Sequence, residues 1–272
     1  MDWLIEPFTF SFIWYAILSS SLVGISCGVL GVYVVQRRMA FIGEALSHTT
    51  LPGLVIAHLY GWSLTFGGMI AALLTALLIG FVSRKQKIKE DTAIGVIFTG
   101  MFALGIILMS RTKSYRDLTH ILFGNVLGVS ENDIYLIILV TFIVLSALFL
   151  FHKELELASF DPTHGEVIGI KSDNLRFLLL GLLALAVVTG IQAVGVILTN
   201  ALLITPAATA CLLTDSLIKR MFFSSIIAIS ASISGIMLSY FFHVSSGAAI
   251  VLSCTFLFGL IHLSKSYFNK DY

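Results

Sequence analysis

Long apolar stretches recur along this 272-residue chain and constrain its fold more than any other feature. Between residues 11 and 267, runs of roughly 20 mostly apolar residues follow one another with short polar breaks. As a helix, each run is long enough to cross about 30 Å of hydrocarbon. Strands of a membrane barrel would instead alternate in short segments with a polar face. The pattern therefore predicts an all-α, polytopic membrane protein.

Polar breaks divide the chain into about nine predicted transmembrane helices, with eight as the alternative count. The second span is interrupted by Pro52 and Gly53, and the sixth and seventh are separated only near Gln192. We find no repeat and no separate soluble domain, so residues 1–272 are expected to form a single transmembrane domain. The predicted spans are residues 11–35, 41–59, 64–83, 91–110, 133–151, 175–191, 193–214, 221–242 and 247–267.

Composition and missing motifs exclude several classes of protein. Charged residues make up 11% of the chain, compared with about 25% in an ordinary soluble domain. No basic nucleic-acid patch is present, so nucleic acid is not expected as a partner. The sequence contains no GxxxxGKS/T loop for ATP and no HExxH motif of a zinc protease. Cys27, Cys211 and Cys254 lie in apolar runs, where buried thiols are expected rather than a disulfide.

Lysine and arginine in the short loops predict the orientation, because cytoplasmic loops are enriched in these residues. Basic residues follow every odd-numbered span, which places the N-terminus outside and the C-terminus in the cytoplasm. One loop dissents, since Arg111, Lys113 and Arg116 fall on the outer side by this count. The residues that set the orientation are Arg37, Arg38, Arg84, Lys85, Lys87, Lys89, Lys153, Lys171, Lys219, Arg220, Lys265 and Lys270.

The stretch GEALSHTTLPG, residues 43–53, carries two ionisable side chains inside the second span. In a helix, Glu44 and His48 project from one face one turn apart, so a carboxylate oxygen and an imidazole nitrogen can meet the same ion. Ionisable residues at membrane depth usually face a pathway or cavity. Pro52 would also free the carbonyl of His48 from the helix ladder. The alternative is an interfacial pair, with Glu44 bonded to nearby Arg38.

Other polar residues are weaker candidates for a pathway. His243 lies at the outer end of the eighth span, where an interfacial histidine is the alternative interpretation. In LTNALLITPAATA, close helix packing is one interpretation and a broken helix lining a cavity is the other. The candidate pathway-lining residues are His120 and Asn125 in the outer loop, and Asn200, Thr205 and Pro206 in the seventh span.

Two loops are longer than a turn. The outer loop, residues 111–132, contains THILFGNVLGVS, which predicts a re-entrant or surface helix. The inner loop, residues 152–174, contains SFDPTHGEVIGIKSDN. Asp161 as N-cap and Pro162 at the first helical position, followed by Glu166 and Gly169, predict a short cytoplasmic helix near residues 160–170.

Six motifs in order resemble a known family, the membrane permeases of ABC importers for manganese and zinc. The resemblance covers nearly the whole chain. It is carried by RRMAFIGEALSHTTLPG, DTAIGVIFTGMFALGIIL, HILFGNVLGVSENDI, SFDPTHGEVIGI, QAVGVILTNALLITPAATA and SSGAAIVL.

The resemblance implies a type II ABC importer permease fold, similar to that of vitamin B12 importers. Two permease copies would form a central pathway above two separate ATP-binding cassette ATPase subunits, and an extracellular metal-binding lipoprotein would deliver the ion. The chain would lie in the lipid of a bacterial cell membrane. It would be a transport subunit rather than an enzyme and would hold no permanent cofactor.

The resemblance also implies roles for single residues. Family members carry a metal-coordinating gate in a D-A-x-S-H motif, which corresponds here to Glu44 and His48. Glutamate in place of the usual aspartate keeps the carboxylate but reaches one methylene further. His243 stands where relatives often have Asp or Asn, and would be a further ligand or an interface residue. The implied ATPase-coupling helix contains Phe160, Asp161, Pro162, Glu166 and Gly169.

A carboxylate and an imidazole suit manganese and zinc alike, and no thiolate cluster favours copper(I). The similarity of HILFGN to manganese members favours Mn²⁺ as the transported ion, with Zn²⁺ as the alternative. A third possibility is a secondary metal transporter driven by an ion gradient. Such a protein would often show an inverted repeat and more acidic residues at mid-membrane, which this sequence lacks.

Overall fold

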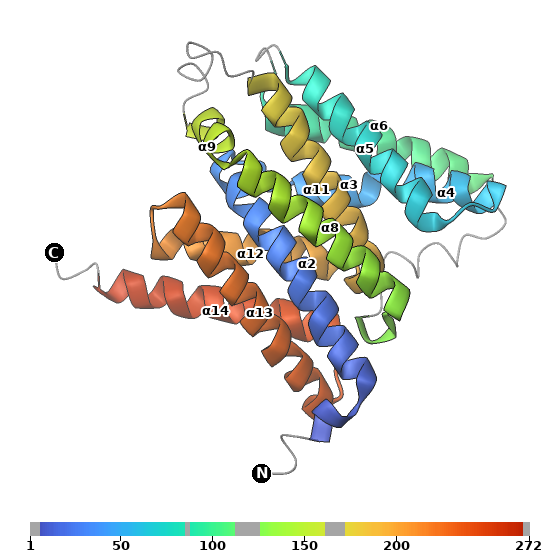
Figure 1. The fold of residues 1–272 in the computed structure, drawn as a ribbon. Coiled ribbons are helices and arrows are strands. Elements are labelled where there is room, and N and C mark those ends of the chain that lie inside the picture. The colour runs from blue at the N-terminus through green and yellow to red at the C-terminus, as the bar shows by residue number, and fades with distance from the viewer. Residues whose placement is uncertain (1–5, 85–87, 112–125, 161–171, 269–272) are drawn as a thin grey trace.

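The computed structural model describes residues 6–84, 88–111, 126–160 and 172–268 (Figure 1). All regular secondary structure among the described residues is helical, which confirms the all-α prediction. The α-helices are α2 (Ser11–Gln36), α3 (Ile42–Thr49), α4 (Leu51–Tyr60), α5 (Leu64–Val82), α6 (Glu90–Ser110), α8 (Glu131–Leu150), α9 (His152–Phe160), α11 (Ser172–Val194), α12 (Val196–Leu213), α13 (Leu217–Phe242) and α14 (Ser246–Phe268). Two short 3₁₀ turns are η1 (Glu6–Thr9) and η2 (Val126–Gly128).

Among the described residues, 8 helices are long and apolar enough to cross a membrane. The remaining predicted span, residues 41–59, is divided into α3 and α4, of 8 and 10 residues. Pro52 lies in the first turn of α4 and has no N–H to donate to the preceding turn, so the helix stops and restarts there. The alternative count of eight therefore describes the long helices, and the ninth segment is the broken pair α3–α4.

The break between the sixth and seventh spans was predicted near Gln192 and lies instead at Gly195. Gly195 has a φ of 91°, in the left-handed region that glycine adopts without steric cost. Thr199 Oγ1 donates to the Gly195 carbonyl at 2.7 Å and closes the first turn of α12. From there α12 continues through Pro206 without a break, so the broken-helix interpretation of this segment is wrong.

Both predicted loop helices fall largely outside the described residues. Helix α9 occupies the first part of the inner loop, which the sequence did not predict because HKELELASF is short and has no apolar run. The coupling-helix residues Asp161, Pro162, Glu166 and Gly169 lie beyond the described residues, as do His120 and Asn125 of the outer loop. Of the outer loop's second half, the structure describes η2.

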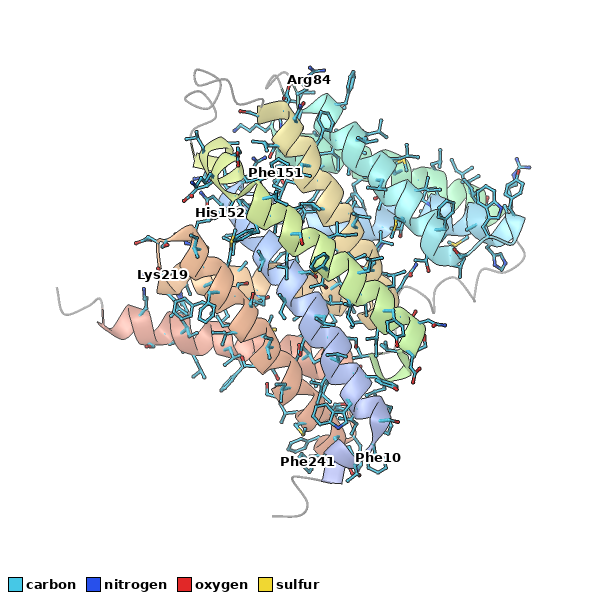
Figure 2. All side chains as sticks on the ribbon, viewed as in Figure 1. Phe10, Arg84, Phe151, His152, Lys219 and Phe241 are labelled. Carbon is cyan, nitrogen blue, oxygen red and sulfur yellow. The ribbon has the colours of Figure 1, made fainter. Side chains whose placement is uncertain are left out.

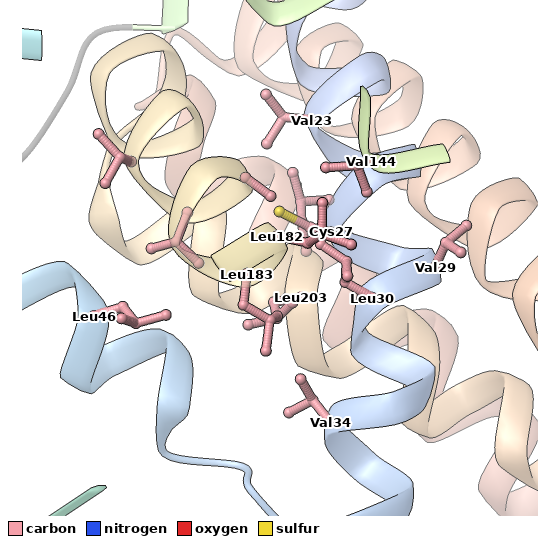
Figure 3. Close-up of a cluster of buried hydrophobic side chains, with 14 of the residues drawn as sticks. Val23, Cys27, Val29, Leu30, Val34, Leu46, Val144, Leu182, Leu183 and Leu203 are labelled. Carbon is pink, nitrogen blue, oxygen red and sulfur yellow. The ribbon is translucent and has the colours of Figure 1, made fainter. Parts of the chain in front are cut away.

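Helix α2 is the centre of one half of the bundle and packs against α8, α11, α12 and α13 (Figure 1). Because helices in lipid gain no hydrophobic energy by associating, they depend on close backbone approach through small residues. Gly31 lies so close to α12 that a Cβ atom there would overlap the Leu203 carbonyl oxygen. On the neighbouring face, Ser224 Oγ of α13 donates to the Gly28 carbonyl at 2.9 Å. Figure 3 shows Cys27 of α2 beside Leu182 of α11, in the buried cluster that also contains Leu203 of α12.

The second half consists of α3, α4, α5 and α6, and α11 packs against both halves. Gly53 of α4 and Gly67 of α5 face each other so closely that a Cβ atom on either would overlap the other's carbonyl oxygen. Helix α11 contacts α5 and α3 on one side and α2 on the other. Helix α11 therefore lies between the two halves and packs against both.

A chain of ion pairs joins α2, α5, α6 and α11 at one end of the bundle. Arg176 Nε lies 3.1 Å from Glu90 Oε1, and Arg176 Nη2 lies 3.2 Å from Asp173 Oδ1. Arg37 also reaches Glu90, at 3.8 Å, and Arg84 reaches Asp173, at 2.9 Å. Burial lowers the pKa of the Arg37 guanidinium, and Glu90 acts in the opposite direction. Figure 2 shows Arg84, His152 and Lys219 toward this basic end, and Phe10 and Phe241 toward the other.

Replacing Gly31 with Ala is expected to destabilise the bundle, because the new methyl group would separate α2 from α12. Overpacking of this kind costs about 1–3 kcal/mol. Gly181→Ala in α11 is the matched control, since a Cβ atom there meets no atom within 4 Å. Thermal unfolding of the detergent-purified protein should show a lower Tm for the first variant alone. Equal Tm values for the two variants would contradict the close contact of α2 with α12.

Candidate metal-binding site

Glu44 and His48 lie on α3, one turn apart, as their spacing predicted. His48 Nε2 donates to Glu44 Oε1 at 2.8 Å. Glu44 is in the first turn of the helix and His48 in the last, where the helix dipole favours a negative and a positive side chain. The two side chains remain 51% and 29% exposed, so an ion can reach both.

Asn200 of α12 holds the carboxylate from the opposite side. Its Nδ2 donates to Glu44 Oε2 at 2.5 Å, across 156 residues of sequence. Ser47 Oγ donates to Asn200 Oδ1 at 3.4 Å and to the Gly43 carbonyl at 2.8 Å. The absence of a side chain at Gly43 makes this possible, because a Cβ atom there would come within 2.7 Å of Asn200 Oδ1. The Glu44 carboxylate is thus bonded at both oxygens.

The ion-pair partner of Glu44 differs from the one that the interfacial interpretation proposed. An interfacial pair would join Glu44 to Arg38. Among the described residues, the only ion pair of Glu44 is with His48. Its partners therefore come from α3 and α12 within the bundle, and the carboxylate is oriented for a role beside His48.

Two aromatic side chains that sequence reasoning missed pack against His48. On α6, Phe98 and Phe102 stack on each other with ring centroids 5.8 Å apart. The His48 ring centroid lies 5.3 Å from that of Phe102, at a steep angle, and 6.0 Å from that of Phe98. Their spacing of four residues on one helix face was the available signal, but it does not stand out within an apolar span.

The remaining predicted residues are spread over the molecule. His243 caps the C-terminus of α13 with a φ of 53° and lines a separate cavity of about 340 Å³ beside Phe12 and Tyr240. The described residues contain no group of three or more His, Cys, Asp or Glu side chains, so His243 does not join Glu44 and His48. Its metal role stays a prediction.

Within α12, Asn200 is the predicted pathway residue that contacts the pair. Thr205 is half-buried and its carbonyl accepts from Thr209 Oγ1 at 2.6 Å, while Pro206 is buried. Both positions fit the packing interpretation of this segment. Phe160 ends α9, and its side chain lies outside the described structure.

Comparison with known proteins adds a consistent set of similarities. The sequence model of the ABC 3 transport family matches residues 9–265. The "Manganese transport system membrane protein MntC" of Listeria monocytogenes is 44% identical over 254 residues, which cover 93% of this chain and 91% of the relative. The "Probable iron transport system membrane protein" of Haemophilus influenzae is 40% identical over 251 residues, 92% of this chain and 93% of the relative.

Solved structures agree with the family match. A chain of "PsaBC from Streptococcus pneumoniae in complex with Fab" has a TM-score of 0.82 at 37% identity and covers 96% of this chain and 94% of its own. The inward-facing structure of "a putative metal-chelate type ABC transporter" has a TM-score of 0.74 at 17% identity, covering 92% of this chain and 85% of that one. The second likeness shows a shared fold.

Removing the Phe102 ring should expose the His48 imidazole. An edge-to-face aromatic contact contributes about 0.5–1.5 kcal/mol, so Phe102→Ala is expected to speed carbethoxylation of His48 by about two- to tenfold. The measurement is mass spectrometry of the His48 peptide after timed diethylpyrocarbonate treatment. Phe142→Ala, at a 69% exposed position on α8, is the control and should leave the rate unchanged. An unchanged rate in both variants would mean that Phe102 does not cover His48.

Proposed function

The chain belongs to the ABC 3 transport family, and we propose that it is the transmembrane permease of an ABC importer for manganese, with Glu44 and His48 in the ion pathway. It is a multi-pass membrane protein, and in this family ATP hydrolysis lies in separate subunits. The observation that carries the proposal is the Glu44–His48 pair on α3, oriented by Asn200 from α12. The resemblance to relatives named for manganese transport supports the choice of ion.

The chemistry of the pair suits transient binding of a divalent cation. A carboxylate oxygen and an imidazole nitrogen are ligands that manganese and zinc both accept. A metal bound between the two side chains would take the lone pair of His48 Nε2 and replace its hydrogen bond to Glu44 Oε1. Asn200 keeps its hold on Oε2 and leaves Oε1 facing the ion.

One copy of the chain offers an incomplete site. In the described residues, no third acidic, histidine or cysteine side chain accompanies Glu44 and His48. A second permease copy that contributes the same pair would complete the coordination, so the proposed pathway lies between two copies. Few ligands per copy also allow release, because a transport site must let its ion leave.

The proposed assembly follows the family resemblance. Residues 1–272 would form one transmembrane domain, with two copies above two ATPase subunits and an extracellular metal-binding lipoprotein at the outer face. A coupling helix near residues 160–170, including Phe160, would contact the ATPase. The N-terminus would lie outside and the C-terminus in the cytoplasm of a bacterial cell. His243, His120 and Asn125 would then lie near the entrance.

Zinc is the second candidate ion. A nitrogen and oxygen site generally binds Zn²⁺ more tightly than Mn²⁺, so affinity alone does not select manganese. Glutamate at position 44 lengthens the carboxylate arm and relaxes the geometry at the ion. The substrate must therefore be determined by transport, with ferrous iron included because one relative is named for iron.

Uptake into proteoliposomes tests the function directly. The permease assembled with its ATPase should take up Mn²⁺ only with ATP, and His48→Ala should lose uptake while still assembling. His58→Ala is the matched control, because His58 is exposed at the end of α4 and should be dispensable. Comparing Mn²⁺, Zn²⁺ and Fe²⁺ names the ion. Metal uptake at the same rate with and without ATP would overturn the proposal. So would full uptake by the assembled His48→Ala variant.

Cysteine labelling tests the orientation. Because the native cysteines are buried or half-buried, a single new cysteine should dominate labelling by a membrane-impermeant maleimide. Tyr60→Cys, at the end of α4, should react in intact cells. Asp215→Cys, fully exposed before α13, should react only after the membrane is permeabilised. The reverse pattern would invert the predicted topology.

A further inference from the structure

A groove on the outside of the bundle is separate from the Glu44–His48 pair. Helices α8 and α13 both pack against α2, and between them they leave a groove of about 720 Å³. Val29 of α2 and Leu148 of α8 are nearly buried at its base, while Phe149 and Ile218 are exposed along its walls. This size is typical of a cavity that holds a small organic ligand.

The groove follows from the way α2 meets its neighbours. Gly28 brings α13 against α2 through the Ser224 hydrogen bond, and Thr141 Oγ1 of α8 donates to the Leu22 carbonyl at 3.4 Å. Both hydrogen bonds join a helix to α2 and neither joins α8 to α13. A gap therefore remains between α8 and α13, and it is lined by Leu145 of α8 and Met221 of α13. The walls are apolar because this surface lies in a membrane span.

The polar rim of the groove marks the membrane boundary. Helix α8 ends at Leu150, and the exposed Phe149, Leu150 and Phe151 give way to His152 and Lys153 of α9. Aromatic and apolar residues followed at once by basic ones are typical of the level of lipid headgroups. Figure 2 shows Phe151 and His152 at this level, toward the basic end of the bundle.

Three polar groups at the rim lack partners within the described chain. Lys153 and Glu154 both line the groove and form no ion pair with a described residue. His152 Nδ1 lies 3.4 Å from the Tyr33 hydroxyl, but His152 Nε2 is buried without a hydrogen bond. Its nearest carboxylate oxygen, on Glu156, is 3.8 Å away, too far for one. A buried polar atom without a partner calls for a ligand or water.

From these observations we propose that the groove binds one zwitterionic phospholipid whose headgroup carries a primary ammonium group, as in phosphatidylethanolamine. An acyl chain lies along the apolar walls. The phosphate oxygens accept from Lys153 and His152, and the ammonium group donates to Glu154. A headgroup without its own cation would leave the Glu154 carboxylate next to a phosphate, and a trimethylated ammonium has no N–H to donate. The inference is independent of the transported ion.

Native mass spectrometry of the permease with its ATPase tests the lipid. Phosphatidylethanolamine, phosphatidylglycerol and phosphatidylcholine are titrated separately, and the bound fraction is followed. Phosphatidylethanolamine should bind about fivefold more tightly than either of the others, the effect expected of one charged contact near the membrane surface. Equal binding of the three lipids, or a preference for phosphatidylglycerol, would overturn the assignment.

Variants locate the contacts. Glu154→Gln should abolish the preference for phosphatidylethanolamine over phosphatidylcholine. Lys153→Gln should weaken the binding of all three lipids about fivefold. Lys265→Gln, on the exposed side of α14, is the matched control and should change nothing. Ile218→Trp should fill the groove and remove the bound lipid. If Ile218→Trp instead changes the ratio of one to two permease copies, the groove is a protein interface. If a variant fails to fold, the relative affinities of the wild-type complex for the three lipids still test the proposal.

Discussion

The absence of water in the hydrocarbon region is the constraint on which this structure depends. Every backbone N–H and C=O in that region must be bonded within the protein, which is why the described chain consists of helices. The same constraint explains where the chain departs from long helices. The ladder breaks at Pro52, between α3 and α4, and this broken segment lies inside the bundle against α5, α6, α11 and α12. Glu44 and His48 are on the first half of that segment, where Asn200 bonds to Glu44, Phe102 packs against His48, and both side chains stay partly exposed.

Helix α6 links the site to the basic end of the bundle. Glu90, the first residue of α6, forms ion pairs with Arg176 and Arg37. Two to three turns further along α6, Phe98 and Phe102 contact His48. Arg176 lies four residues after Ser172, where α11 begins, and Arg37 Nε donates to Ser159 of α9 at 3.2 Å. The start of α6 is therefore bonded to α11 through Arg176, and to the end of α2 through Arg37, which is itself bonded to α9.

Sequence reasoning reached the membrane spans and the Glu44–His48 pair because both depend on local signals. Apolar length identifies a span, and four-residue spacing puts two side chains on one helix face. It misplaced the break at Gly195, since a single glycine in an apolar run does not reveal its φ angle. It missed α9, which has no apolar run, and it could not find Phe98 and Phe102, which look like any other lipid-facing or core aromatics. Asn200 was identified as polar in an apolar span, but its bond to Glu44 is a contact between residues 156 positions apart that no local pattern encodes.

The protein handles its ionisable groups in two different ways. At the basic end, the buried Arg176 is paired with Glu90 and Asp173, and these two carboxylates also pair with Arg37 and Arg84. Around His48, by contrast, the partners are a carboxylate and neutral groups, and the side chains stay partly exposed. A closed network with several charges fixes one arrangement of helices. The half-exposed Glu44–His48 pair is bonded to itself and to one amide, so a cation that reaches it has a single ion pair to replace, which agrees with the proposed role in the ion pathway.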